Sequence, residues 1–329
     1  MSKLSITAYT FGIICFIICC SMAIFYGFKF LSNDVTLEEE SMEDYKYHFV
    51  LVPEELDNDY WRLVEAGAQK AAKEHNVLLE YIGPEQADND IHIKTIEKVA
   101  AAKVDGIFTQ GLNNEQFTPL INQIVEKIPV ITVDTDASSS NRVAYIGTDN
   151  YYAGYLAGKA LIEDTKGKAN VAIIAGNLEA NHQQQRVDGF KEAVKDEQGI
   201  EIIAIEESKI SRVRAAEKAY LILSEHPEVN AFYGTSALDG IGIARMIEKY
   251  DQPSRIYVIG FDTLPETIDY MRKGTIEATV AQEPEEMGYK SIKMMINVSK
   301  GKYVPSIVHT NTSILRVKDV PLNDEKGDK

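Results

Sequence analysis

The chain has 329 residues, and its 50 Asp and Glu side chains outnumber its 34 Lys and Arg side chains, giving a formal net charge of −16. An acidic surface of this kind repels phosphate backbones, which argues against a nucleic-acid partner. Hydrophobic residues make up 45% of the chain, enough to bury a substantial core.

The first element is an apolar run over residues 4–28 that contains no charged side chain. As a helix it would extend roughly 37 Å at about 1.5 Å per residue, enough to cross a bilayer. It is longer than a signal-peptide core and lacks a small-residue cleavage site after it. We therefore predict an uncleaved transmembrane anchor over residues 4–31. Cleavage and lipidation are the alternatives, although Ile18 precedes Cys19 where a lipidation site needs a small residue.

Residues 32–45 are predicted to form an acidic linker, since they hold six carboxylates and no basic residue. Lys3 lies before the apolar run, and no Lys or Arg follows it between Lys29 and Lys46. The positive-inside tendency then places the N-terminus in the cytoplasm. We expect a single-pass protein of the cell membrane whose soluble part is extracytoplasmic.

The rest of the chain alternates short apolar runs with segments of helical spacing. Continuous apolar runs of this length are typical of strands buried on both faces of a parallel sheet. Strand–helix alternation predicts a doubly wound α/β fold, and the number of runs predicts two lobes rather than one sheet. The runs cover residues 47–52, 77–82, 104–109, 129–134, 171–176, 201–206, 230–235, 256–261 and 278–282.

Polar and aromatic side chains follow the ends of these strands, where ligands of such sheets bind. Carboxylates accept hydrogen bonds from hydroxyl groups, and amides both donate and accept them. Aromatic rings offer a flat apolar face to the C–H face of a sugar. This combination indicates carbohydrate binding, and the candidate residues are Asn58, Tyr60, Trp61, Gln110, Asp134, Gln184, Ser236, Asp262 and Gln282.

Each candidate also has a purely structural explanation. Trp61 could pack in the core of a lobe, as most aromatic residues do. Asn58, Asp134 and Asp262 could cap the helices or loops that follow the strands. His182 has no partner at metal-ligand spacing and is expected to be a surface or hydrogen-bonded residue.

The sequence carries none of the common catalytic motifs. It has no phosphate-binding P-loop, no G-x-S-x-G nucleophile elbow and no H-E-x-x-H metal motif. We therefore predict a binding protein rather than an enzyme, with no cofactor and no metal.

The soluble part resembles the ribose/galactose/xylose-type periplasmic sugar-binding proteins, which share their fold with the effector domains of lactose-repressor-type regulators. The resemblance is carried by LDNDYWRLVEAGAQKAAKE, IPVITVD, YIGTDNYYAGYLAG, QQRVDGFKEAV and IGFDTLPETIDYMRKGTIEATVAQEPEEMGY. It implies two lobes joined by a three-stranded hinge. The first lobe is then expected over residues 46–148 plus 283–311, and the second over residues 149–282 plus 312–322.

The resemblance also implies roles for individual residues. Asn58, Tyr60 and Trp61 match the first loop of the family, and Asp134 and Asp262 match its two hydroxyl-binding carboxylates. Phe261 matches a pocket residue, Gln282 matches the amide beside the hinge, and Gln110 stands where the family often has Asn. The sequence departs from ribose binders at three positions: Thr135 and Gln184 stand in place of Arg, and Ser236 in place of Asn.

Because Arg offers forked donors that an amide replaces only in part, the ligand need not be ribose. We expect a neutral aldose, with pentoses such as xylose or arabinose favoured. The expected partner is either an ABC permease or a sensor histidine kinase in the membrane, since no sequence rule separates them. A receptor for a small furanosyl quorum signal is a rival. A repressor effector domain is another, although the apolar run occupies the place of its DNA-binding domain.

Overall fold

The computed structural model describes residues 21–22, 45–112, 115–250 and 256–320. The chain divides into two units, residues 1–46 and residues 47–329, and the second unit carries the fold described below. No helix in the described ranges has both the length and the apolar character needed to cross a membrane. The predicted anchor over residues 4–31 and the predicted linker over residues 32–45 lie almost entirely outside those ranges.

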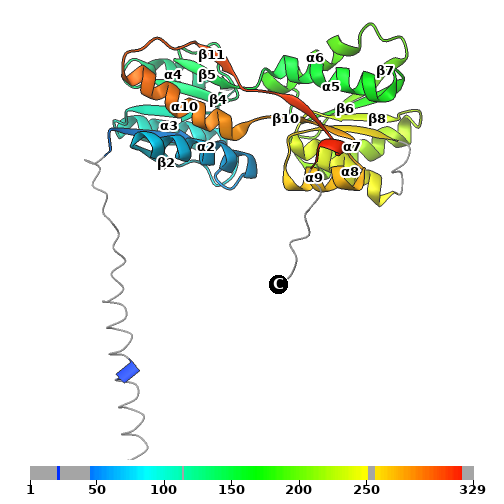
Figure 1. The fold of residues 1–329 in the computed structure, drawn as a ribbon, viewed down its shortest axis with the longest axis horizontal. Coiled ribbons are helices and arrows are strands. Elements are labelled where there is room, and N and C mark those ends of the chain that lie inside the picture. The colour runs from blue at the N-terminus through cyan, green and yellow to red at the C-terminus, as the bar shows by residue number, and fades with distance from the viewer. Residues whose placement is uncertain (1–20, 23–44, 113–114, 251–255, 321–329) are drawn as a thin grey trace, which may run out of the picture. The chain divides into compact units, whose positions relative to one another are not determined.

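The second unit contains two six-stranded sheets, one in each lobe (Figure 1). The strands of the first sheet are all parallel, in the order β11-β5-β4-β3-β1-β2. These strands are β1 (Tyr47–Val52), β2 (Val77–Tyr81), β3 (Gly106–Thr109), β4 (Val130–Asp134), β5 (Ala144–Gly147) and β11 (Ile307–His309).

The second sheet repeats this arrangement in the order β12-β10-β9-β8-β6-β7. It differs in that its edge strand β12 runs antiparallel to β10. The strands are β6 (Ala169–Ala175), β7 (Ile200–Glu207), β8 (Ala231–Gly234), β9 (Tyr257–Phe261), β10 (Ala278–Ala281) and β12 (Ser313–Arg316). The predicted α/β fold with two parallel-sheet lobes is therefore confirmed.

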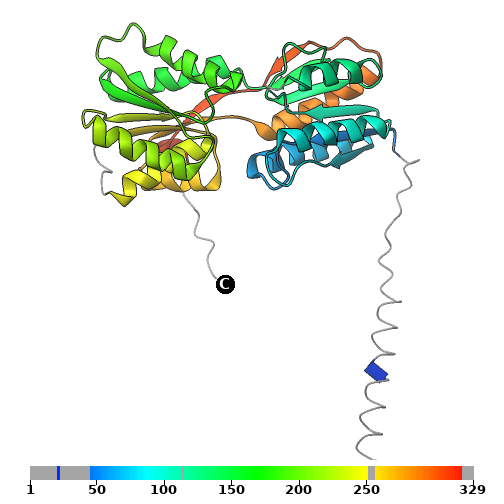
Figure 2. The ribbon, with the colours of Figure 1, turned by 180° about the vertical axis from the view of Figure 1, so that it is seen from behind.

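Helices cover both faces of each sheet, as the view from behind also shows (Figure 2). The first lobe carries α2 (Asp59–His75), α3 (Asn89–Ala101), α4 (Phe117–Val125) and α10 (Pro284–Ser299). The second carries α5 (Asn150–Thr165), α6 (Asn181–Val194), α7 (Arg212–Glu225), α8 (Ala237–Lys249) and α9 (Pro265–Lys273). Apolar clusters fill the space on either face of each sheet, which is how a two-sided α/β core is built.

The chain passes between the two sheets three times, after β5, after β10 and between β11 and β12 (Figure 1). The first two passages lead directly into helices, α5 and α10 respectively. The exact limits of the lobes given above stay a prediction.

Each of these two helices is packed against a neighbouring helix of its own lobe by a close approach of backbones, α5 against α6 and α10 against α2. A Cβ atom on Gly154 of α5 would lie 1.9 Å from the carbonyl oxygen of Arg186 in α6, and one on Gly189 would lie 1.9 Å from that of Tyr151. Gly67 of α2 and Gly288 of α10 make the same reciprocal pair in the first lobe. The helices that leave the passages are thus packed directly on α6 and α2, whose N-terminal ends face the site.

Candidate functional site

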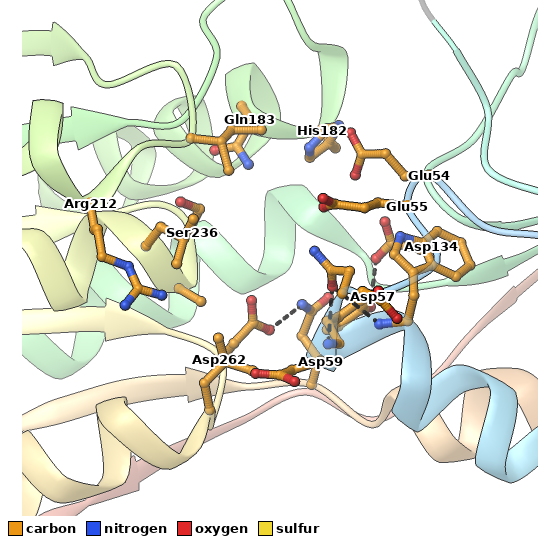
Figure 3. A pocket seen from close by; sticks show the side chains of 18 of the residues that line it. Glu54, Glu55, Asp57, Asp59, Asp134, His182, Gln183, Arg212, Ser236 and Asp262 are labelled. Carbon is orange, nitrogen blue, oxygen red and sulfur yellow. Dashed lines mark hydrogen bonds between the residues drawn. The ribbon is translucent and has the colours of Figure 1, made fainter. Parts of the chain in front are cut away.

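A cavity of about 280 Å³ lies between the two lobes, and residues of both lobes line it (Figure 3). Its walls come from the loops and helix starts that follow the carboxyl ends of the strands, where parallel sheets bind their ligands. A second hollow of about 550 Å³ adjoins it, and Glu54, His182 and Ile210 border both.

The first-lobe wall is built at the start of α2. The Asn58 side chain caps this helix by accepting hydrogen bonds from the backbone N–H of Tyr60 at 3.0 Å and of Trp61 at 3.3 Å. Trp61 is only 2% exposed and packs in the core of the lobe while its edge borders the cavity. Both residues therefore have the structural roles expected for them and also line the cavity, while their contact with a sugar stays a prediction.

Asp134 ends β4 in a strained backbone conformation. Its φ is 67°, and the Thr135 N–H donates to the Val133 carbonyl at 2.8 Å, which closes a γ-turn about Asp134. Tyr60 donates its hydroxyl to Asp134 Oδ1 at 2.5 Å, and the Thr135 hydroxyl donates to Oδ2 at 3.1 Å. Asp262 follows the corresponding strand β9 of the second lobe with a φ of 64°. Both lobes thus present a carboxylate from a left-handed residue at the same place, and such strain clusters at binding sites.

The second-lobe wall is built around Arg186. Its Nε donates to Asn150 Oδ1 at 2.8 Å, and its Nη1 donates to the Thr235 carbonyl at 2.9 Å. The guanidinium carbon lies 3.6 Å from the centre of the Phe261 ring. A guanidinium fixed on two sides and stacked on a ring presents its remaining N–H groups to the cavity in one orientation.

Two of the passages between the lobes are joined beside the cavity. Gln282, just after β10, donates from Nε2 to Asp262 Oδ1 at 2.5 Å. The Thr148 hydroxyl, just after β5, donates to Gln282 Oε1 at 2.5 Å. Asn150 donates to the Thr148 carbonyl at 3.2 Å, so a line of hydrogen bonds runs from Arg186 to Asp262.

Burial governs the electrostatics of the carboxyl groups. Desolvation raises the pKa of Asp262 to about 6, with a further rise from Asp134 and an opposing effect of Arg186 and Gln282. Desolvation also raises the pKa of Asp134, opposed by the Tyr60 hydroxyl and Arg186. Glu54 has its pKa raised to about 7 by desolvation and then by Asp134.

His182 behaves in the opposite sense, since burial and the neighbouring Arg186 lower its pKa to about 3. Its ring is therefore neutral at physiological pH, and its Nδ1 atom has no hydrogen-bond partner within the described part of the chain. Within the described ranges, no group of three or more His, Cys, Asp or Glu residues is arranged to hold a metal ion. The arrangement suits a ligand rich in hydroxyl groups that donates to the carboxylates and accepts from Arg186.

The structure brings most of the predicted site residues together. Those that line the cavity are Asn58, Tyr60, Trp61, Asp134, Ser236, Asp262 and Gln282. The adjoining hollow is lined by Gln110, Thr135 and Gln184. The ring of Phe261 stacks against the guanidinium group of Arg186.

Three of these side chains have further structural roles. Gln184 turns away from the main cavity and donates its amide to the Leu178 carbonyl at 2.6 Å. Ser236 caps α8 and donates its hydroxyl to Asp239 at 2.6 Å. Gln110 is only 7% exposed, and its Oε1 has no hydrogen-bond partner in the described structure.

Sequence reasoning missed several lining residues, of which Arg186 matters most. Gln184 was expected to stand in place of an Arg, yet the Arg two positions on reaches the cavity. A signal was available, because the buried positions of α6 include Gln183, Arg186, Val187 and Phe190 at helical spacing. An Arg on the buried face of a helix needs partners, which marks it as a structural or binding residue. The other missed residues include Glu54, Glu55, Asp57, Asp59, His182, Gln183 and Arg212.

Comparison with known proteins agrees with the two-lobed α/β fold. Residues 49–303 match the model of the periplasmic binding protein domain. The chain is 66% identical to GanP, a glucose-galactose binding protein from Geobacillus stearothermophilus, with a TM-score of 0.81 over 84% of this chain and 99% of that one. It is 35% identical to a chain of the XylFII–LytSN complex, with a TM-score of 0.77 over 84% of this chain and 99% of that one.

Curated relatives are more distant but cover similar lengths. The chain is 25% identical over 269 residues to the D-allose-binding periplasmic protein of Escherichia coli (strain K12), which covers 78% of this chain and 86% of the relative. The resemblance noted in the sequence is therefore confirmed, and the chain belongs to the periplasmic binding protein domain family.

Proposed function

We propose that the chain is a receptor for a neutral monosaccharide, which it binds between its lobes without chemical change. The observation that carries the proposal is the pair of half-buried carboxylates, Asp134 and Asp262, that the two lobes present to one cavity beside Arg186. A sugar hydroxyl can donate to a carboxylate and accept from a guanidinium at the same time. A ligand that bridges both lobes favours their closed arrangement.

The ligand is proposed to be an aldose. The sequence alone favours a pentose such as xylose or arabinose. The 66% identity to a glucose-galactose binding protein supports glucose and galactose, and we place these two first.

The protein is also proposed to be anchored in the cell membrane by residues 4–31, with residues 47–320 outside. Its partner is then a membrane protein that responds to lobe closure, either an ABC permease or a sensor histidine kinase. The 35% identity to a chain of the XylFII–LytSN complex supports a protein partner for this chain.

A thermal-shift titration of residues 46–329 tests the ligand. Glucose, galactose, xylose, arabinose, ribose and a disaccharide are compared at equal concentrations. A sugar present at about 100 times its dissociation constant adds about 2.7 kcal/mol to the free energy of unfolding, which moves the melting temperature clearly. A shift with one aldose supports the proposal and names the sugar, and no shift with any of them overturns it.

Fractionation of cells that express the full chain tests the anchor. We expect the full chain in the membrane fraction, where protease added to intact spheroplasts removes the soluble part. A version that begins at residue 46 serves as the control and is expected outside the membrane fraction. Full-length protein in the soluble fraction would contradict the proposed anchor.

A further inference from the structure

The second lobe carries a groove between α7 and α8 that meets the cavity described above at Arg212 and is otherwise lined by different residues. It encloses about 540 Å³, and we call it the α7–α8 groove. The residues that characterise it are Arg212, Val213, Tyr220, Arg245, Lys249 and Tyr250. A second hollow of about 310 Å³ begins on the other side of Tyr220 and Tyr250.

Large apolar side chains are exposed in this groove. Val213 is 68% exposed, and Tyr220 and Tyr250 are each 45% exposed. The two tyrosine rings lie 4.9 Å apart and separate the two hollows. A single exposed apolar residue is ordinary, but a concave cluster of Tyr and Val is typical of a surface that another molecule covers.

The charge of the groove is opposite to that of the chain. Arg212, Arg245 and Lys249 border it, whereas Glu217 is the one carboxylate among its lining residues. The whole chain carries a net charge of −16. Arg212 is paired with Glu266 at 2.8 Å, while Arg245 and Lys249 are exposed. Two arginines and two tyrosines line the groove, and Arg and Tyr are among the residues that dominate protein–protein binding energy.

The groove reaches the edge of the cavity between the lobes. Arg212, at the start of α7, lines both the groove and the cavity, and Figure 3 draws it among the side chains that line the cavity. A molecule seated in the groove would therefore contact the rim of the cleft on the second lobe.

We propose that the α7–α8 groove is the docking surface for a protein that presents carboxylates around an aromatic or aliphatic side chain. The apolar side chain would enter the groove beside Tyr220, and the carboxylates would pair with Arg245 and Lys249. An anionic lipid surface or a nucleic acid fits less well, because the net charge of −16 opposes approach to both and two adjoining hollows suit inserted side chains. Any response of the docked protein to sugar binding depends on the proposed function.

The test uses the full chain in its membrane, with the photoreactive residue p-benzoylphenylalanine in place of Val213. We expect one cross-linked protein, whose cross-linked peptide carries Asp or Glu within a few residues of the attachment point. The same label in place of Tyr303, which is 93% exposed on the first lobe, serves as the positional control and is expected to miss this protein.

Charge reversal makes the test specific. Arg245→Glu with Lys249→Glu is expected to lower the cross-linking yield at least tenfold, because the new carboxylates would face the partner's carboxylates and like charges repel. Lys159→Glu with Lys191→Glu changes the net charge equally, at exposed sites of α5 and α6 on the same lobe, and is expected to leave the yield unchanged. Replacing the partner's carboxylates near the cross-link with Lys should restore the yield.

Equal yields in the two double variants, or cross-links to phospholipid in place of protein, would overturn the docking proposal. Sugar binding is measured on the same variants by calorimetry and should stay within about twofold of the native value. Absence of sugar binding in the native chain counts against the proposed function alone. Sugar binding with no carboxylate-dependent cross-link counts against the groove alone.

Discussion

At the scale of single residues, the site combines strain with buried charge. Asp134 and Asp262 both have φ values in the left-handed region, where non-glycine residues are rare and Asp is tolerated better than most. Both also carry carboxyl groups whose pKa is raised by burial. Neither the backbone strain nor the buried charge stabilises the fold, so we expect both residues to lower the free energy of unfolding and to strengthen ligand binding.

The replacement Asp262→Asn tests this trade. Because the pKa of Asp262 is raised from 3.8 to about 6, the folded chain keeps a proton that the unfolded chain has already released. The charge therefore destabilises the fold fully above pH 6, and this effect disappears as the pH falls toward 4. We expect Asp262→Asn to raise the free energy of unfolding by about 3 kcal/mol at pH 8 and by little at pH 4. Urea unfolding at both values measures it.

Sugar binding should change in the opposite direction. Asp262→Asn is expected to weaken the affinity at least a hundredfold at pH 8, because a carboxylate that accepts from hydroxyl groups is lost. In the native chain the affinity should fall as the pH drops through about 6, where Asp262 takes up a proton beside Asp134, Arg186 and Gln282. Unchanged affinity across this range in calorimetric titrations would contradict the role of Asp262.

Thr148 is expected to orient the Gln282 amide. Its hydroxyl donates to Gln282 Oε1, which turns Nε2 toward Asp262. Thr148→Val keeps the shape but removes the donor, so Gln282 Oε1 is left without its hydrogen bond and the amide is held only by its bond to Asp262. We expect sugar affinity to fall about tenfold, a cost of roughly 1.4 kcal/mol, with Thr148→Ser restoring it. Equal affinities for Thr148→Val and Thr148→Ser would argue against this role.

Individual site residues were predicted where their signal was local. Asp134 is the last residue of a strand, and Asp262 and Gln282 each follow a strand directly, so strand ends alone located them. Arg186 lies inside a helix, and its contacts with Asn150 and Phe261 come from segments 36 and 75 positions away in a fold that the sequence does not display. Without that geometry, the family resemblance placed Gln184, and not Arg186, at the position of the family's Arg.

At the scale of secondary structure, the apolar runs predicted the buried strands well. The strands β5, β11 and β12 were not among the predicted runs. β11 and β12 have three and four residues and are largely exposed or half-buried, so they show no apolar pattern. β5 is buried, but its sequence AYIG is too short to stand out from its surroundings. Such strands are defined by their neighbours in the sheet rather than by their own composition.

The pairing of α5 with α6 gives a prediction at this scale. Because a Cβ atom on Gly154 would lie 1.9 Å from the Arg186 carbonyl oxygen, Gly154→Ala must push α6 away. We expect a loss of about 2 kcal/mol in the free energy of unfolding, typical of overpacking, despite the better helix propensity of Ala. Sugar affinity should fall as well, since Arg186 moves with α6.

Gly260→Ala in β9 provides the control for Gly154→Ala. Its added Cβ atom would meet nothing closer than 3.5 Å, an ordinary contact. We expect it to change stability and affinity far less than Gly154→Ala, as measured by urea unfolding and calorimetry. A larger effect of Gly260→Ala would show that the close helix contact is not what positions Arg186.

At the scale of the whole molecule, two similar sheets are connected by three chain passages, and the site lies between them. The number of apolar runs predicted two lobes, and the resemblance predicted three passages. Neither could show which side chains join the passages to the site, because Thr148, Gln282 and Asp262 are far apart in the sequence and meet only in the folded chain.

Closure of the lobes is the motion that this arrangement predicts. The sugar would gain contacts with Asp134 on one lobe and Asp262 on the other only when the lobes approach, so binding must favour the closed arrangement. Small-angle scattering of residues 46–329 should then give a radius of gyration that falls with sugar toward roughly 19 Å, the value for a compact chain of this length. Asp262→Asn should show no fall at the same sugar concentration. A native radius that stays constant while calorimetry reports full binding would mean that the sugar binds without closure, and the partner would then have to recognise the sugar-bound cleft by another feature.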